Sequence, residues 1–149
     1  MKIVVDTNII FSCLLNTNST IGDLIFNSTE VFEFCSCDYM RYEIHKHWSK
    51  LRKISKLTEV DLQNSYDKTL AHIYFINEEL IQPAIWLKAE DIVRSIDKDD
   101  VDFVALTRHL KGGLWTGDKQ LYEGLKAQKF RRVFNTTDLI KLRNKLTDK

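Results

Sequence analysis

Two aspartates in this 149-residue chain stand at positions where α/β proteins often place catalytic groups. Asp6 follows the apolar run 3–5, Asp118 follows the run 114–116, and a predicted helix begins just after each aspartate. If both runs are central parallel strands, both carboxylates reach the edge of the sheet where ligands of open α/β sheets bind. Taken alone, either residue could serve only as a turn or helix cap. Their shared position favours a common site.

Further acidic residues are expected at the same edge. Asp97 and Asp100 are three residues apart at the start of a helix, so they can lie on one face, and Glu43 falls early in the helix after the second predicted strand. By itself, the run 97–102 is also typical of a solvated acidic loop that caps the next helix. Carboxylates that converge repel one another and need a cation. Mg²⁺ and Mn²⁺ prefer such oxygen ligands, and they can bind a phosphodiester and acidify a bound water.

The residues therefore predict a Mg²⁺ or Mn²⁺ site. Its expected catalytic and metal-binding side chains are four acids, with Asp97 as an optional fifth: Asp6, Glu43, Asp100 and Asp118. Thr116, together with the hydroxyl of Thr7 or the amide of Asn8, is expected to orient these carboxylates from behind. Either Thr7 or Asn8 is also expected to cap the first helix.

The surrounding pattern alternates strands and helices along one domain, residues 1–149. The predicted strands are residues 3–5, 31–37, 80–82, 114–116 and 132–134. The predicted helices are residues 8–16, 21–27, 38–55, 58–77, 84–96, 103–110 and 120–127, and a last helix capped within 135–137. This alternation predicts a three-layer α/β/α sandwich around a parallel sheet of about five strands.

Charge is unevenly distributed, although the net charge is only +1. Residues 57–104 hold eleven acidic and four basic residues, whereas residues 38–56 hold six basic and two acidic ones, and residues 119–149 hold nine basic and three acidic ones. An acidic centre between basic segments suits a cation site beside a groove for a polyanion. Ordinary solvated helix faces would give the same pattern.

The cysteines and the apolar runs indicate a cellular setting. Three cysteines are an odd number, and no run approaches the ~18 apolar residues of a membrane span or forms a secretory leader. We expect a cytoplasmic protein with reduced thiols and no membrane association. Cys35 and Cys37 are expected to be core thiols because no second cysteine pair is available for a zinc site.

Four segments together resemble the PIN-domain nucleases, including the VapC-type toxins of bacterial toxin–antitoxin pairs. They are VDTNIIF (5–11), YEIHKH (42–47), DKDDVDFVAL (97–106) and LWTGDKQL (114–121). The resemblance implies an α/β/α sandwich that cleaves RNA with Mg²⁺ or Mn²⁺ held by three or four acids. Matched motif by motif, those acids are Asp6, Glu43, Asp100 and Asp118, and Asp97 matches an extra acid of some members.

The match departs from the family in two places. Asp99 and Asp102 flank Asp100, so the third acid could be Asp99 or Asp97 instead, and Thr107 stands where a small residue is usual. No acid is missing, so the resemblance implies an active metal-dependent endoribonuclease, with an antitoxin protein as partner and a homodimer as a plausible assembly. Candidate contacts to the RNA backbone are six basic residues: Lys46, Lys50, Lys53, Lys119, Arg131 and Arg132.

Two other classes compete with this prediction. A Mg²⁺-dependent phosphatase with an aspartate nucleophile after the first strand requires a second aspartate two residues later, where this chain has Asn8. A non-catalytic RNA-binding module would be expected to lack some of the acids. The five glycines are scattered and form no phosphate-binding loop, and no nucleophile elbow is recognisable.

Overall fold

The computed structural model describes residues 1–148 and contains one sheet of five parallel strands. The strands are β1 (Lys2–Val5), β2 (Glu33–Cys37), β3 (Tyr74–Ile76), β4 (Gly113–Trp115) and β5 (Val133–Phe134), in the spatial order β3-β2-β1-β4-β5. β1 is central, and its residues Ile3, Val4 and Val5 are fully buried, as expected for a strand covered on both faces.

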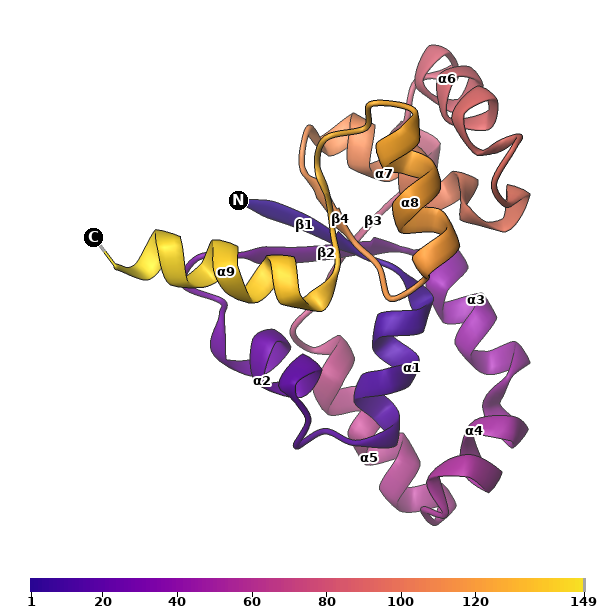
Figure 1. Ribbon diagram of the computed structural model, residues 1–149. Coiled ribbons are helices and arrows are strands. Elements are labelled where there is room, and N and C mark those ends of the chain that lie inside the picture. The colour runs from indigo at the N-terminus through magenta and orange to yellow at the C-terminus, as the bar shows by residue number, and fades with distance from the viewer. Residues whose placement is uncertain (149) are drawn as a thin grey trace.

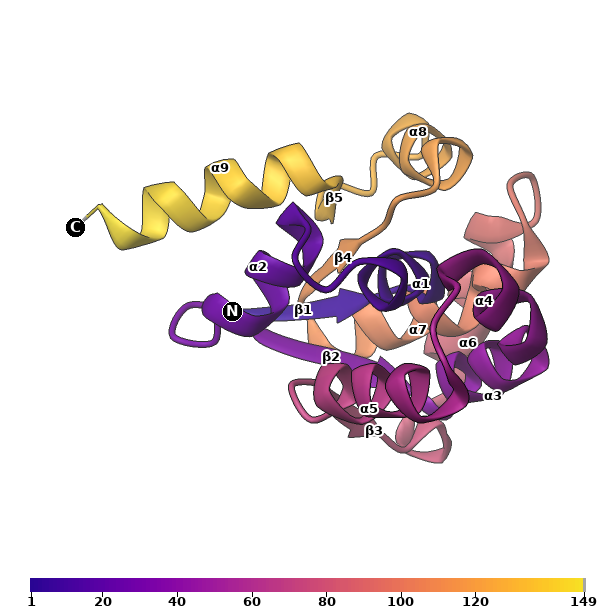
Figure 2. The same cartoon turned by 90° about the horizontal axis from the view of Figure 1, so that it is seen from below.

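Helices cover both faces of the sheet (Figure 1). Those between β1 and β3 lie on one face: α1 (Thr7–Leu15), α2 (Thr20–Asn27), α3 (Asp38–Lys46), α4 (Trp48–Ser55) and α5 (Glu59–Leu70). Those between β3 and β5 lie on the other: α6 (Pro83–Val93), α7 (Val101–Leu110) and α8 (Lys119–Ala127). The last helix, α9 (Thr136–Thr147), runs back beside the sheet (Figure 2). This arrangement confirms the expected α/β/α sandwich.

The direction of the connections changes between two neighbouring strands. From β1 the chain continues to helices on one face, and from β4 it continues to α8 on the other face. The paired strands β1 and β4 align Val4 with Leu114 and Val5 with Trp115. A crevice opens outside the carboxyl ends of two strands that diverge in this way, and this is where open α/β sheets bind their ligands.

The third strand differs from the prediction. Residues 80–82 were expected to form it, but Leu80 ends a 3₁₀ turn, Glu78–Leu80. The strand is Tyr74–Ile76, inside the segment 58–77 that was expected to be helical. The apolar run there fits a helix stripe as well as a strand. Pairing of Cys35 with Tyr74 and Cys37 with Ile76 on the edge of the sheet decides between them, because strand formation depends on the neighbour that is available.

The expected helix 38–55 is two helices that change direction at His47. His47 leaves helical geometry, with φ −105° and ψ 15°, and its ring lies edge-on to that of Phe11 with the ring centroids 5.9 Å apart. Neither proline nor glycine marks the break in the sequence. Packing of α4 against α1 accounts for the change of direction, and local propensity gives no sign of it. Helix α6 likewise ends at Val93 instead of residue 96.

Within residues 1–148, no single helix is long and apolar enough to cross a membrane. The bent pair α1 and α2 is long and apolar enough only when both helices are taken together, and Ile10, Leu14 and Leu24 of this pair are buried in the core.

We predict that Asn135→Ala destabilises the protein by about 1 kcal/mol, because Asn135 caps α9. Its side chain accepts a hydrogen bond from the Asp138 backbone N–H at 2.8 Å, and the Asp138 carboxylate accepts one from the Asn135 N–H at 3.3 Å. Urea unfolding followed by circular dichroism measures the change. Asn135→Ser retains a capping oxygen and should lose much less stability; equal losses in the two variants would show that the cap does not stabilise α9.

Candidate active site

Asp6 is held at the end of β1 by two hydrogen bonds. The residue is only 3% exposed. Its carboxylate accepts a hydrogen bond from the backbone N–H of Ile9 at 3.1 Å and another from the hydroxyl of Thr116. Asp6 is thus the cap of α1, and the expectation that Thr7 or Asn8 caps this helix is wrong. Its side chain fits the cap because the strand delivers it to the helix start in extended geometry, whereas Thr7 is already the first helical residue.

Thr116 joins the ends of β1 and β4. It is 1% exposed, and its hydroxyl donates to the Asp6 carboxylate while accepting from the Asp118 backbone N–H at 3.0 Å. Asp118 in turn caps α8, accepting from the backbone N–H groups of Gln120 at 2.9 Å and Leu121 at 3.3 Å. The structure therefore brings Asp6 and Asp118 to one edge of the sheet through a single bridging hydroxyl.

Glu43 reaches this edge from α3. It is half-buried, and its carboxylate accepts a hydrogen bond from the hydroxyl of Thr7 at 2.5 Å. Burial raises the pKa of Glu43, and the Thr7 hydrogen bond opposes that rise. Of the two side chains expected to orient a carboxylate here, Thr7 makes the contact, whereas Asn8 is exposed and lines a groove between α1 and α4.

Asp100 completes the group from the turn that precedes α7. Its Oδ2 atom is buried and has no hydrogen-bond partner among residues 1–148. Burial raises the pKa of Asp100 to about 7, with further contributions from the negative charges of Asp97, Asp6, Asp118 and Glu43. Asp6, Glu43, Asp100 and Asp118 are hereafter called the acidic cluster.

The neighbours of Asp100 are placed differently. Asp97 is exposed, and its carboxylate accepts a hydrogen bond from the Asp99 backbone N–H at 3.0 Å, which caps the turn. Asp99 is exposed as well. The Asp102 side chain makes a hydrogen bond with Glu78. Among the acids of this run, Asp100 has a buried carboxylate oxygen that lacks a partner in residues 1–148, and the charges of Asp6, Asp118 and Glu43 raise its pKa.

Burial also dominates the electrostatics of Asp6. Desolvation raises its pKa from 3.8 to about 7; the hydrogen bonds from Thr116 and Ile9 oppose the rise, and the charges of Asp118 and Glu43 add to it. A carboxylate costs free energy when it is buried without a counter-charge, so Asp6 and Asp100 take up protons near neutrality. A bound cation would remove the need for those protons.

The residues present fit a hard divalent ion. All four acids offer oxygen ligands, and the unpartnered Asp100 Oδ2 is a buried acceptor that a cation would satisfy. No three carboxylates of the acidic cluster come within 4.8 Å of one another in residues 1–148. That spacing suits Mg²⁺ or Mn²⁺, which are commonly held by one or two carboxylates, with waters and phosphate oxygens filling the remaining positions.

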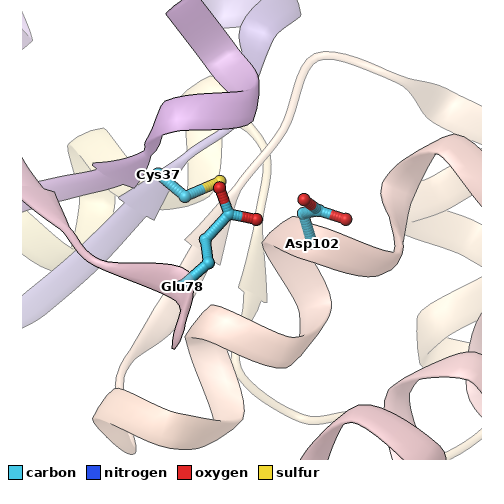
Figure 3. A group of neighbouring side chains, drawn as sticks. All are labelled: Cys37, Glu78 and Asp102. Atoms are coloured by element: carbon cyan, nitrogen blue, oxygen red, sulfur yellow. The ribbon is translucent and has the colours of Figure 1, made fainter. Parts of the chain in front are cut away.

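A second group of potential ligands lies between the end of β2, the 3₁₀ turn Glu78–Leu80 and α7 (Figure 3). One ligand atom from each of Cys37, Glu78 and Asp102 lies within 4.8 Å of the others. Burial raises the pKa of Asp102 to about 8, and its hydrogen bond with Glu78 and the nearby charges of Glu78 and Glu43 add to the rise. Glu78 also accepts from the Tyr39 backbone N–H at 3.2 Å. Cys37 ends β2 and Glu78 follows β3, so this group lies at the same edge of the sheet as the acidic cluster.

Glu78 was not predicted as a candidate ligand from the sequence. It stands in a segment read as leading into a strand, and only the 3₁₀ turn Glu78–Leu80 brings it against α7. Cys35 and Cys37 are buried, as expected of core thiols, and burial raises the pKa of both.

The predicted RNA-contacting residues fall into two places. Lys119 opens α8 next to Asp118 and lies 3.9 Å from Glu123, with both side chains largely exposed. Lys46, Lys50 and Lys53 are exposed on α3 and α4. Arg131 and Arg132 instead precede β5, so they lie at the amino ends of the strands, away from the acidic cluster.

Comparison with known proteins identifies the family. The family model described as the PIN domain matches residues 4–138, so the chain belongs to the PIN-domain family. A chain of VapBC2 from Rickettsia felis, crystallised bound to a DNA fragment from their promoter, superposes with a TM-score of 0.66 at 13% sequence identity. That match covers 91% of the present chain and 98% of the other, and it supports the fold. No curated protein matches the sequence at a significant level.

The pKa of Asp6 leads to a pH-dependent stability without metal. Since its pKa rises from 3.8 in the unfolded chain to about 7, the native protein binds more protons between these values. The resulting stability is fully present below pH 3.8 and is lost as the pH rises through 7. In EDTA, the Tm of wild type relative to Asp6→Asn should therefore fall between pH 5 and pH 8, because the amide does not titrate.

Differential scanning fluorimetry measures this difference, with the exposed Asp91→Asn as the matched control. Millimolar Mn²⁺ at pH 7.5 should raise the Tm of wild type and of Asp91→Asn, and should raise that of Asp6→Asn much less. A Tm difference that does not vary with pH would mean that Asp6 is ionised in the metal-free protein.

Proposed function

We propose that this protein is a metal-dependent endoribonuclease that hydrolyses RNA phosphodiester bonds at the acidic cluster. The observation that carries the proposal is the buried, unpartnered Asp100 Oδ2, which shares the crevice between β1 and β4 with three further carboxylates. Four acids kept close together at a ligand-binding edge are unfavourable without a cation. Membership of the PIN-domain family supports nuclease chemistry, and the family resemblance supports RNA as the substrate.

The proposed roles follow from the contacts. Asp6, Glu43, Asp100 and Asp118 would hold Mg²⁺ or Mn²⁺, with Asp97 available at the rim. Such an ion supplies Lewis acidity toward a phosphoryl oxygen and lowers the pKa of a water molecule bound to it. Thr116 fixes the Asp6 carboxylate and Thr7 fixes that of Glu43, so the ligands are oriented before an ion arrives.

The substrate would lie across the open side of this edge. Lys119 stands beside Asp118, and Lys46 and Lys50 flank the end of α3, so their positive charges can contact the RNA backbone near the reacting phosphate. Lys53 is one turn further along α4. These residues position RNA without reading its sequence, since phosphate contacts carry no base information.

We further propose that the protein is the toxin of a toxin–antitoxin pair that acts in the cytoplasm. The structural similarity to a chain of VapBC2, together with the family resemblance, supports this role. The cognate antitoxin would block the crevice, and a homodimer is a compatible assembly. The phosphatase alternative gains no support, because the position two residues after Asp6 is the exposed Asn8.

RNA cleavage tests the proposal directly. Structured and single-stranded RNAs are incubated with Mn²⁺, with Mg²⁺ or with EDTA. Wild type and the control Asp91→Asn should cut in the presence of metal, and Asp6→Asn and Asp100→Asn should not. Both variants should fold, because each removes a carboxyl group whose burial disfavours its charge. Equal cutting by all four proteins would assign the activity to a contaminant, and no cutting by wild type with any substrate or metal would contradict the proposal.

Thr116→Val tests whether the Thr116 hydroxyl orients the Asp6 carboxylate for metal binding, since Thr116 is not itself an expected metal ligand. The change keeps the shape of the side chain and removes the hydrogen bonds to Asp6 and to the Asp118 N–H, so metal affinity or activity should fall by about 10–100-fold. The cleavage rate is measured against Mn²⁺ concentration for wild type, Thr116→Val and Thr116→Ser, the last of which retains the hydroxyl. Unchanged metal dependence in Thr116→Val would show that Asp6 needs no such support.

A further inference from the structure

A second charged feature lies far from the acidic cluster. The end of α7, the turn before β4 and the loop 129–132 surround a cleft of about 410 Å³. Five of its lining residues are basic and one is aromatic: Arg108, Lys111, Lys129, Arg131, Arg132 and Phe130. No acidic residue lines it.

The cleft lies at the opposite edge of the sheet from the acids. Lys111 precedes β4 and Arg132 precedes β5. Asp6, in contrast, follows β1, and Asp118 follows β4; all of these strands are parallel neighbours. The strands separate the two sites by about 15 Å along their length, at roughly 3.3 Å per residue. The basic cleft therefore cannot contact the phosphate that is bound at the acidic cluster.

The positive charges of the cleft have little to balance them. None of the five basic residues takes part in an ion pair within residues 1–148. The carboxyl end of α7 supplies only about half a negative charge. At that helix end, the Arg132 guanidinium donates a hydrogen bond to the Lys111 carbonyl oxygen at 2.9 Å. The other four basic residues are exposed and have no acidic partner among residues 1–148.

The cleft gathers five of the chain's basic residues in one recess. Removing these five residues from the chain's 22 lysines and arginines leaves 17, against 21 aspartates and glutamates. The rest of the sequence is therefore acidic, and the net charge of +1 conceals a strongly basic recess. Like charges that are kept together without counter-ions indicate a polyanionic ligand.

The backbone around the cleft is fixed. Lys111 and Lys129 adopt left-handed conformations, with φ of 54° and 63°. Gly112 lies against the start of β1, where a Cβ atom would come within 2.4 Å of the Lys2 carbonyl oxygen. The Gly112 N–H donates to the Thr107 carbonyl oxygen at 3.1 Å, and the Leu114 N–H donates to the Arg132 carbonyl oxygen at 2.8 Å. The basic side chains thus project from a preformed recess.

We propose that this basic cleft binds single-stranded RNA at a point several nucleotides away from the cleaved bond. Phosphates contact Arg108, Lys129 and Arg131, and an unstacked base lies on the partly exposed ring of Phe130. An aromatic ring within a basic recess is the arrangement by which proteins hold single strands, whereas the bases of a duplex are stacked and paired and so cannot reach such a ring. The identity of the ligand as RNA rests on the proposed function.

Binding in EDTA tests the proposal without cleavage. A fluorescein-labelled, unstructured 20-nucleotide RNA is titrated with wild type, with Arg108→Ala/Arg131→Ala and with the control Lys88→Ala/Arg94→Ala, which removes two exposed charges, one on α6 and one just after it. Two lost phosphate contacts should reduce the slope of log K against log salt concentration by about 1.4 and weaken binding about 25-fold at 0.1 M salt. The control should follow wild type.

A second measurement locates the RNA. Wild type is crosslinked to the same RNA carrying 4-thiouridine, and the modified peptide is mapped by mass spectrometry. A crosslink within residues 129–132 supports the proposal even if the double variant folds poorly.

Several results would overturn the proposal. They are equal affinity of the cleft and control variants, absence of RNA binding by wild type, and crosslinks confined to the acidic edge. Competition arms with a 20-base-pair DNA duplex, with inorganic phosphate and with vesicles of 3:1 phosphatidylcholine and phosphatidylserine identify other sources of phosphate. If Arg108→Ala/Arg131→Ala weakens the binding of one of these three competitors and does not weaken the binding of RNA, that competitor, and not RNA, is the ligand of the cleft. Failure of the nuclease proposal is detected separately in the cleavage assay, where wild type would not cut RNA or Asp6→Asn would cut it equally well.

Discussion

The hydrogen bond between the Thr116 hydroxyl and the Asp6 carboxylate is the contact on which the proposed active site depends. It forms because β1 and β4 pair in parallel with Val5 opposite Trp115, which places the next residue of each strand side by side. The same hydroxyl accepts from the Asp118 N–H, so one buried threonine sets the relative position of two acids that are 112 residues apart. Each of these acids also caps the helix that follows, so the same carboxylate oxygens stabilise the fold and form part of the proposed site.

The fold holds these acids in an unfavourable state. Burial raises the pKa of both Asp6 and Asp100 to about 7, and the Asp100 Oδ2 atom is left without a partner in residues 1–148. A chain selected for stability alone would replace such groups by apolar ones. Their presence at a strand-end crevice is characteristic of a functional site, where unfavourable burial prepares side chains for a ligand. Nearby, burial also raises the pKa of Asp102, but its carboxyl group makes a hydrogen bond with Glu78.

The two edges of the sheet carry opposite charge. The carboxyl ends of the strands present the acidic cluster, and the amino ends present the basic cleft around Phe130. An RNA chain is attracted to the basic edge and, without metal, repelled from the acidic one. In the proposed function, the cation reverses the local charge where cleavage occurs, while the distant cleft holds the strand. The net charge of +1 reveals neither edge.

The sequence by itself determined the parallel α/β/α architecture, since alternating apolar runs and capped helices leave few other solutions. It also predicted Asp6 and Asp118 at one site, because a strand that ends just before an aspartate places that residue at the sheet edge whichever partners surround it, whereas it left the third acid open among Asp97, Asp99 and Asp100. Only the tertiary structure decided the rest. Pairing with β2 made residues 74–76 a strand, and packing against α1 divided the helix at His47. The fold also separated Arg131 from the acids and brought Glu78 to Asp102. These placements depend on segments that are far apart in the chain, so local sequence does not predict them.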